Sequence, residues 1–222
     1  MAGKIHRFDS YDLRKHMGSG IKTFIDIGAN VGTTSIMARV LFPKAKIIAI
    51  EPAKATFEKL KFFSTWFIEC FQFALGDGKP VCFHDRGHLG LNRFYAEAEK
   101  NWWPKDSYTV PSLPLGEIAN RFGMTAPCIV KIDCEGGERH LLSDPHSVPI
   151  LKQAIQICME IHPGFGGKPE AWGEWLKRFE DSHDLLIGGW CQGKRRYVYA
   201  PAPNGFVPHK MCQIQLLSKE WS

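Results

Sequence analysis

The stretch TFIDIGANVG at residues 23–32 decides how this chain folds. Residues 23–27 form a continuous apolar run, which is typical of a strand covered on both faces. The glycines that follow permit a tight turn in which a ligand touches the backbone, and residues 33–42 continue with helical spacing of apolar side chains. This order of strand, turn and helix predicts the first unit of an α/β fold.

The rest of the chain repeats this alternation. We expect strands over residues 46–50, 66–75, 81–84, 128–133 and 154–161, and an antiparallel hairpin of strands near 184–188 and 196–200 that turns at 191–194. Helical spacing is clearest over 170–180, with shorter helices over 115–121, from Glu138 to Leu142, and around Phe57. The sequence therefore predicts a Rossmann-like α/β fold with a mostly parallel seven-stranded sheet, helices on both faces and a C-terminal antiparallel hairpin.

Length and composition indicate one domain. A chain of 222 residues that is 44% hydrophobic can build one sizeable core but not two. We expect a single domain over residues 1–222, in which residues 1–20 form an N-terminal extension. Residues 85–108 contain Trp102 and Trp103 without periodicity, and we predict that they form a lid or an acceptor loop.

Composition also restricts location and partners. No apolar run is long enough to span a membrane, and no secretory signal is found at the N-terminus, so we expect no membrane contact. The seven cysteines form no CxxC pair and most lie in predicted strands, which indicates a reducing, cytoplasmic setting. The net charge of +5 comes from scattered basic residues and no nucleic-acid-binding module is recognisable, so nucleic acid is an unlikely partner. The oligomeric state is left open.

The turn predicts the class of cofactor. Asp26 precedes the turn and Asn30 replaces the middle glycine of the dinucleotide fingerprint. An acid at this position suits a cationic amine or sulfonium and repels a pyrophosphate. Glu51 ends the next strand, about 20 residues further on, where a carboxylate can accept hydrogen bonds from both ribose hydroxyls. These features fit S-adenosyl-L-methionine, with S-adenosyl-L-homocysteine as its product.

Further residues near these two acids complete the expected cofactor site. The segment Ala74 to Asp77 is either a wall of the adenine pocket or a plain turn. We expect the cofactor to contact Asp26, Gly28, Ala29, Asn30, Gly32, Glu51, Pro52, Ala74, Leu75 and Asp133.

A second group of polar residues ends two predicted strands. Asp133 and Glu135 follow one strand, and Glu160 and His162 end the other, where ligands bind in open α/β sheets. Methyl transfer to an alcohol requires alignment, exclusion of water and removal of a proton. His162 is a candidate base because imidazole titrates near pH ~6.5, and it is equally a candidate structural residue.

The three acids of this group have other candidate roles. Glu135 and Glu160 orient the acceptor or act as the base if desolvated, and Asp133 lines the methionine end of the cofactor or touches the acceptor. Glu138 at a helix start is expected to be structural. The carboxylates and His162 together are able to hold a divalent metal, but their spacing matches no metal motif, so we expect none.

These strings together resemble the FkbM-type family of class I S-adenosylmethionine-dependent methyltransferases. The resemblance covers roughly residues 23–162 and rests on DIGANVG, Glu51-Pro52, Ala74-Leu75-Gly76-Asp77, KIDCEGGE at 131–138 and Glu160-Ile161-His162. It implies the class I fold and methyl transfer, usually to a hydroxyl of a sugar, glycan or natural product. The chain departs from the family at Pro114, where an aspartate is frequent, and matches it only loosely after His162.

Three other functions remain as alternatives. A nucleic-acid methyltransferase is suggested by the basic isoelectric point, but Asp133-Cys134-Glu135-Gly136 stands where amino-directed DNA methyltransferases have a Pro-Pro-aromatic motif. A non-catalytic cofactor-binding protein is disfavoured by the intact turn and Glu51. A nicotinamide oxidoreductase is disfavoured by Asp26 and Asn30.

Overall fold

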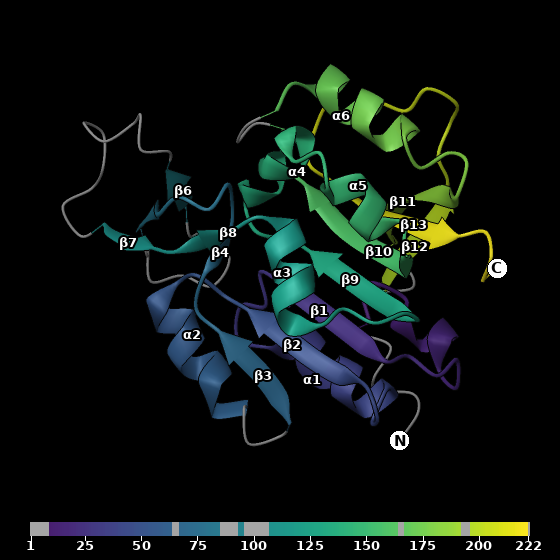
Figure 1. Ribbon diagram of the computed structural model, residues 1–222. Coiled ribbons are helices and arrows are strands. Elements are labelled where there is room, and N and C mark those ends of the chain that lie inside the picture. Colours follow the sequence, from purple (N-terminus) through teal and green to yellow (C-terminus); the bar gives the residue numbers. More distant parts are fainter. Residues whose placement is uncertain are drawn as a thin grey trace.

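The main feature of the fold is one large sheet. The computed structural model describes residues 9–63, 67–84, 93–95, 107–163, 167–191 and 196–221. Eight strands form the sheet in the order β12-β11-β13-β10-β9-β1-β2-β3 (Figure 1). In that order their bounds are Arg196–Pro201, His183–Cys191, Cys212–Ser218, Ala154–Ile161, Cys128–Ile132, Thr23–Ile27, Lys46–Ile50 and Ile68–Phe71.

Strand direction divides this sheet into two parts. Strands β3, β2, β1, β9 and β10 are all parallel. β13 runs antiparallel to its neighbours β10 and β11, and β12 runs antiparallel to β11. The predicted Rossmann-like class with a C-terminal antiparallel hairpin is confirmed, with eight strands in place of seven. The unpredicted strand is β13, which lies between β10 and the hairpin.

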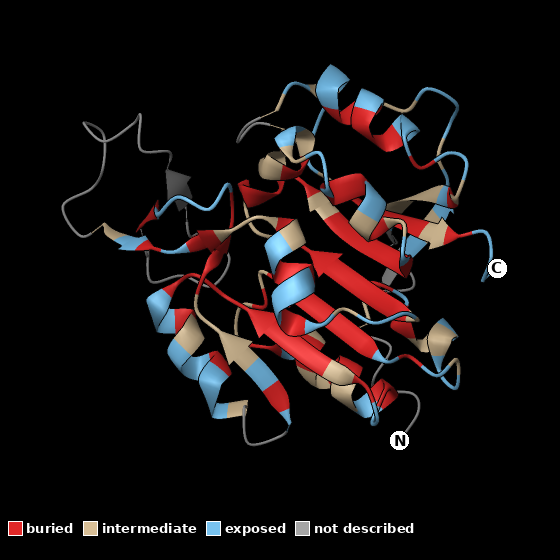
Figure 2. Cartoon of the chain, viewed as in Figure 1, coloured by how far each residue is buried: buried red, intermediate tan, exposed pale blue. Residues whose placement is uncertain are grey.

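Helices cover both faces of the sheet, as predicted. α1 (Thr33–Leu41) and α2 (Lys54–Lys61) pack on the face that carries Phe24 and Ile47. The opposite face, which carries Ile25 and Ile48, is covered by α3 (Leu115–Phe122), α4 (His140–Ser143), α5 (Ser147–Leu151) and α6 (Pro169–Lys177). Figure 2 shows the buried strands between these layers. The strands whose sequences are continuous apolar runs are thus the ones covered by helices on both faces.

The predicted strand over residues 66–75 is divided in the structure. β3 stays in the main sheet, whereas β4 (Ala74–Leu75) leaves it and pairs with β8 (Ser112–Leu113). A third small sheet consists of β5 (Val81–His84), β6 (Arg93–Tyr95) and β7 (Tyr108–Val110). Most of the predicted lid at 85–108, including Trp102 and Trp103, lies outside the described residues.

The described part of the expected N-terminal extension packs into the core. Tyr11 and Leu13 are buried beside α1, and a 3-10 turn at Leu13–His16 follows. The side-chain amides of Gln156 and Gln215 donate hydrogen bonds to the carbonyl oxygen of Tyr11 at 2.8 and 2.7 Å. This segment is therefore hydrogen-bonded to β10 and β13 and forms part of the domain core.

Two smaller differences concern local structure. The helix expected from Glu138 to Leu142 begins as a 3-10 turn at Gly137–Arg139 and continues as α4. The expected hairpin forms between β11 and β12, but its strands are longer than predicted, and residues 192–195 of its turn lie outside the described residues. Within the described chain, every helix is too short or too polar to cross a bilayer.

Candidate functional site

A cavity of about 380 Å³ lies at the carboxyl ends of the central parallel strands. The turn after β1 contributes Gly28, Ala29 and Asn30, and β2 is followed by Glu51 and Pro52. The segments that follow β9 and end β10 contribute Asp133, Glu135 and Glu160. Most of the residues that the sequence assigns to cofactor and acceptor are thus brought together at one edge of the sheet, as expected for parallel α/β proteins.

The turn after β1 fits closely against the end of β9. Gly28 has a φ of +78°, and a Cβ added there would lie 1.8 Å from the carbonyl oxygen of Asp133. Only glycine is compatible with both the conformation and the space. Asn30 has a φ of +52° and donates its backbone N–H to Oε2 of Glu51 at 2.8 Å. Its buried side-chain oxygen Oδ1 accepts no hydrogen bond from any described residue.

Glu51 is held rigidly at the wall of the cavity. Its Oε1 accepts hydrogen bonds from the backbone N–H of Ala53 at 2.9 Å and from the hydroxyl of Thr56 at 3.0 Å. Only 6% of the residue is exposed, and burial raises the pKa of its carboxyl. Because each carboxylate oxygen has two lone pairs, Oε2 retains capacity for a ligand hydroxyl beside the Asn30 bond.

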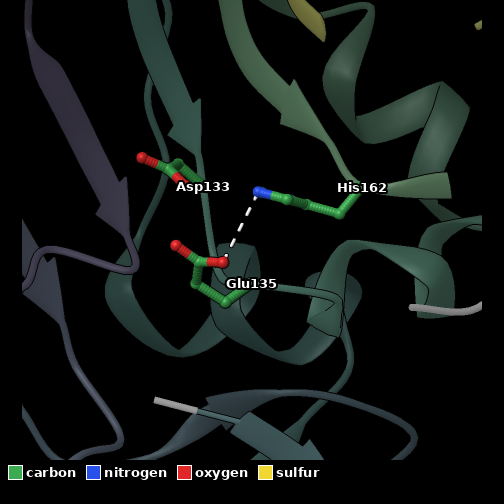
Figure 3. A group of neighbouring side chains, drawn as sticks. All are labelled: Asp133, Glu135 and His162. Carbon is green, nitrogen blue, oxygen red and sulfur yellow. Dashed lines mark ion pairs between the residues drawn. The ribbon is translucent and has the colours of Figure 1, made fainter. Parts of the chain in front are cut away.

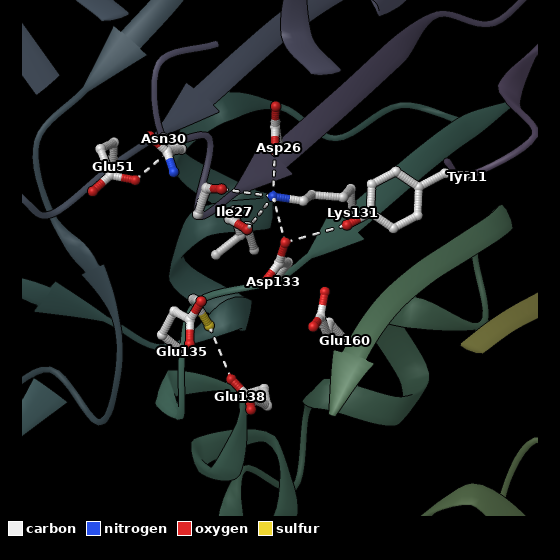
Figure 4. A network of polar contacts seen from close by, with 12 residues as sticks. Tyr11, Asp26, Ile27, Asn30, Glu51, Lys131, Asp133, Glu135, Glu138 and Glu160 are labelled. Atoms are coloured by element: carbon white, nitrogen blue, oxygen red, sulfur yellow. Dashed lines mark hydrogen bonds and ion pairs between the residues drawn. The ribbon is translucent and has the colours of Figure 1, made fainter. Parts of the chain in front are cut away.

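Asp26 lies beneath the cavity and is not one of the described residues that line it. It is fully buried, and its Oδ2 accepts a hydrogen bond from the hydroxyl of Ser35 at 2.6 Å. Its Oδ1 lies 3.1 Å from Nζ of Lys131 (Figure 4). The structure therefore does not bring the Asp26 carboxylate to the cavity surface, where the sequence prediction placed it.

Lys131 links the turn to both acids on its face of the sheet. Its Nζ donates to the carbonyl oxygen of Gly28 at 2.6 Å and forms a second ion pair with Asp133 at 3.7 Å. Burial lowers the pKa of Lys131, but the carboxylates of Asp26 and Asp133 raise it to a net value above the usual range. Sequence reasoning did not select Lys131, although its place two residues before Asp133 puts both side chains on one face.

The described lining of the cavity carries more negative than positive groups. Its acidic side chains are Glu51, Asp133, Glu135 and Glu160, and the only described cation is Lys131. Lys131 is already paired with Asp26 and Asp133. The cavity thus presents an environment that attracts a cation and repels a polyphosphate.

His162 lies behind the acids rather than in the cavity lining. Its Nε2 lies 3.6 Å from Glu135 and 3.7 Å from Glu160, and Figure 3 shows the first of these pairs. On its other side Nδ1 lies 2.8 Å from Oε1 of the buried Glu138. Burial lowers the pKa of His162, but the hydrogen bond and the negative charge of Glu138, with Glu135 and Glu160, raise it to about 9. The ring is therefore an imidazolium at neutral pH.

Glu138 has the structural role that the sequence suggests. Its Oε1 also accepts the backbone N–H of His162 at 3.0 Å, and its Oε2 accepts that of Gly136 at 2.9 Å. The carboxylate therefore ties the end of β10 to the turn that follows β9. It also fixes the orientation of the His162 ring.

Glu160 and Glu135 are the two acids beside His162 that also line the cavity. Burial, followed by the charge of Asp133, raises the pKa of Glu160 to about 7. Burial also raises the pKa of Glu135, whose backbone adopts a φ of +53° that is rare for a residue with a side chain. Strained backbone of this kind is found at sites where the surrounding structure fixes a side chain for a task.

Asp133, Glu135 and His162 are also the residues that could hold a metal. One ligand atom from each lies within 4.8 Å of the others (Figure 3). A metal, however, binds the neutral imidazole, and the three surrounding carboxylates keep His162 protonated. At neutral pH the positive charge of the His162 ring therefore offsets part of the negative charge of these carboxylates.

Three of the predicted cofactor residues, Gly32, Ala74 and Leu75, do not line the main cavity. Ala74 and Leu75 line a small space of about 10 Å³ that also includes Gly28 and Pro52. Gly32 packs against α2, because a Cβ added there would lie 2.8 Å from the side chain of Leu60. Ala74, Leu75 and Pro52 thus line one space, whereas Gly32 lies against α2.

Two lining residues were missed by sequence reasoning. Tyr11 reaches the cavity from the N-terminal segment, and its hydroxyl donates to Oδ2 of Asp133 at 3.3 Å. Gln213 reaches it from β13. Neither residue lies in a motif. Tyr11 belongs to the segment that precedes the DIGANVG motif, and Gln213 lies on the unpredicted strand β13. A hint for Gln213 was the alternation of polar and apolar residues over 213–216.

Comparison with solved structures identifies the class of fold. The crystal structure of methyltransferase FkbM from Methylobacillus flagellatus KT aligns with a TM-score of 0.52 and 10% identity. The alignment covers 89% of this chain and 44% of that chain, so this chain spans less than half of that protein. The fold is that of a Rossmann-like class I methyltransferase.

The family follows from the sequence itself. A family model described as "Methyltransferase FkbM domain" matches residues 26–185, and the chain belongs to this family. The resemblance predicted from the motifs is confirmed. No sequence among curated proteins matches the chain.

Two other solved structures are similar at lower TM-scores. Precorrin-6y C5,15-methyltransferase from Geobacter metallireducens GS-15 aligns with a TM-score of 0.40 and 12% identity over 92% of this chain and 86% of that one. The N-terminal domain of human METTL16 in complex with SAH aligns with a TM-score of 0.42 and 14% identity over 93% and 66%.

Proposed function

We propose that this protein transfers a methyl group from S-adenosyl-L-methionine to a hydroxyl of a sugar, glycan or other natural product. The observation that carries the proposal is the acidic cavity at the strand ends. Both Glu51 and Glu160 line it, and the pKa of the Glu160 carboxyl is about 7. The first acid suits an adenosyl ligand, and the second suits proton removal near neutral pH.

The residues present fit this cofactor. Bound there, it supplies an electrophilic methyl group on a positively charged sulfur. Glu51 offers Oε2 to the ribose hydroxyls, and Asn30 offers its unpaired Oδ1 to a further donor. We assign Pro52, Ala74 and Leu75, which line a small space beside Gly28, to the wall of the adenine pocket. The surplus of carboxylates attracts the sulfonium and the amino group, and it opposes a dinucleotide with its pyrophosphate.

Asp26 acts on this site indirectly. Its ion pair with Lys131 orients the Nζ that holds the carbonyl oxygen of Gly28. We therefore assign Asp26 to fixing the turn and not to a direct contact with the sulfonium. Asp133 has the more accessible carboxylate and lines the cavity, so it is the acid we assign to the methionine end.

Glu160 is the base we favour for the acceptor hydroxyl. A base must be unprotonated at the working pH, and a carboxyl with a pKa of about 7 is divided between both forms there. His162, protonated up to about pH 9, is a poor base. It holds Glu160 and Glu135 in place, which makes it a positioning residue.

The test is methyl transfer with labelled S-adenosylmethionine to a panel of aryl glycosides, hydroxylated natural products and RNA. We expect label in the hydroxyl compounds, and little with Glu160→Gln, whereas Glu58→Gln on the exposed side of α2 behaves as the wild type. Label in RNA alone would replace the proposal with the nucleic-acid alternative. Cofactor binding without transfer to any member would support the non-catalytic alternative.

A further inference from the structure

A second cavity of about 630 Å³ lies beside the first. It is lined by β11 at Ile187 and Gly188, by residues 206–211, and by the start of β13. Glu160 and Gln213 line both cavities. The two spaces therefore share a wall at the residue to which we assign proton removal.

Gln213 stands directly beside Glu160. The two residues are cross-strand partners in the β10–β13 pairing, so their side chains project from the same face of the sheet. Gln213 is only 6% exposed, yet its side-chain oxygen Oε1 accepts no hydrogen bond from any described residue. A buried polar atom without a partner is rare, and a ligand that donates to it is favoured.

The next glutamine on the same strand shows what a structural glutamine looks like here. Gln215 donates from Nε2 to the carbonyl oxygen of Tyr11 at 2.7 Å and accepts at Oε1 from Lys15 at 2.9 Å. Both of its polar ends are satisfied by the protein. Gln213 lies two residues before Gln215 on β13 and lines the cavity. It differs from Gln215 because its Oε1 accepts no hydrogen bond from the described residues.

The second cavity suits a ligand that is partly apolar. Ile187, Phe206, Val207 and Met211 line it, with Lys210 among the polar contributors. An apolar framework can pack against these side chains while its hydroxyls reach Glu160 and Gln213.

We infer that the second cavity holds the acceptor, and that Gln213 selects an acceptor with two neighbouring hydroxyls. This inference rests on the proposed function. The reacting O–H bond breaks and its proton passes to Glu160. The oxygen forms a bond to the methyl carbon as the bond from that carbon to sulfur breaks, and the sulfur keeps the electron pair. The neighbouring hydroxyl donates to Oε1 of Gln213 and thereby fixes which oxygen faces the methyl group.

The test combines one variant with paired acceptors. The probes are p-nitrophenyl hexopyranosides and the matching sugars that lack the hydroxyl next to the methylated one. Gln213→Leu should lower kcat/KM for the complete sugar roughly 5-fold to 100-fold, as expected for one lost hydrogen bond to a buried group. The deoxy sugar should react equally with both proteins, because the contact is already missing.

Binding of S-adenosylhomocysteine separates this inference from the proposed function. If the wild type does not bind it, the proposed function fails. If it binds equally to wild type and Gln213→Leu, and some hydroxyl compound of the panel is methylated, three results would overturn the inference alone: no loss with the variant, an equal loss on both sugars, or no transfer to any glycoside probe.

A second variant tests the location of the acceptor. Ile187→Trp places a large ring in the second cavity and leaves the lining of the first unchanged. We expect it to abolish transfer to the glycoside while S-adenosylhomocysteine binds with unchanged affinity. Undiminished transfer by this variant would show that the acceptor lies elsewhere.

Discussion

The Nζ of Lys131 lies 3.1 Å from Oδ1 of Asp26, and both side chains are buried. This relationship changes how the first acid of the DIGANVG motif is interpreted. The sequence suggests that Asp26 faces a cationic cofactor, whereas the structure already gives it a cation from the neighbouring strand. The motif at residues 26–32 and the motif at residues 131–138 are thus coupled by one ion pair.

Breaking that pair should destabilise the fold. Asp26→Ala leaves the buried Lys131 with only the longer ion pair to the half-buried Asp133, and it removes the acceptor of the Ser35 hydroxyl. We expect the free energy of unfolding in urea to fall by about 3–5 kcal/mol. Asp77→Ala, at an exposed site near Lys79, serves as the control and should change little. Wild-type stability in Asp26→Ala with lost cofactor binding would instead favour a direct contact with the cofactor.

Glu51 should determine affinity for the adenosyl group. Glu51→Gln removes a charged acceptor and weakens the bonds to Asn30 and Ala53. The dissociation constant of S-adenosylhomocysteine, measured by calorimetry, should rise roughly 10-fold to 100-fold. Glu58→Gln should bind as the wild type does. An unchanged constant in Glu51→Gln would show that this carboxylate does not contact the ligand.

Methyl transfer should increase as the pH rises through about 7. The pKa of Glu160 is about 7, so its carboxyl is protonated below this pH and able to accept a proton above it. Glu160→Gln should lower kcat by roughly 10²–10⁴ and remove this rise. Glu174→Gln, exposed on α6, should leave the profile unchanged. A wild-type rise that persists in Glu160→Gln would assign the base elsewhere.

Stability should decrease as the pH rises from about 6.5 to about 9. The pKa of His162 is raised to about 9 in the folded state, above the value of about 6.5 of a free imidazole. The folded protein therefore binds more protons in this window, and the stabilising term, on the order of 3 kcal/mol, is complete below it and lost above it. The raised pKa of Glu160 acts in the same direction.

Urea unfolding across this pH range checks the sign. His162→Gln should flatten the decrease, and His146→Gln, at an exposed position, should not. A stability that rises between these pH values would contradict a protonated His162 in the folded state.

Removal of metal should leave methyl transfer intact. The geometry of Asp133, Glu135 and His162 resembles a ligand set, but His162 holds its proton in this environment. We therefore expect the same kcat after dialysis against EDTA and no gain on addition of Mg²⁺. Loss of activity with EDTA that Mg²⁺ restores would show that the cluster binds a metal despite its charge.

Local patterns predicted the central half of the fold. β1, β2, β9 and β10 are each covered on both faces, so their sequences are continuous apolar runs that a window of a few residues reveals. The acids at their ends could be placed for the same reason, because the carboxyl ends of parallel strands meet at one edge. The positions of Glu51, Asp133, Glu135 and Glu160 were therefore accessible from sequence.

Long-range pairing was not accessible in the same way. β13 contains Gln213 and Gln215, which are buried only because Glu160, Tyr11 and Lys15 lie opposite them. Its insertion between β10 and β11 follows from tertiary contacts. The charge state of His162 likewise depends on three carboxylates, two from the segment after β9 and one from β10. The usual pKa of a free imidazole therefore suggested a base where the folded site holds an imidazolium.

The most direct test is calorimetric titration of the purified protein with S-adenosylhomocysteine and, in parallel, with NADH. The acidic cavity beside Glu51 predicts micromolar binding of S-adenosylhomocysteine and no detectable binding of NADH, whose pyrophosphate meets like charge. Binding of NADH without binding of S-adenosylhomocysteine would contradict the assignment of the cavity to an adenosyl cofactor.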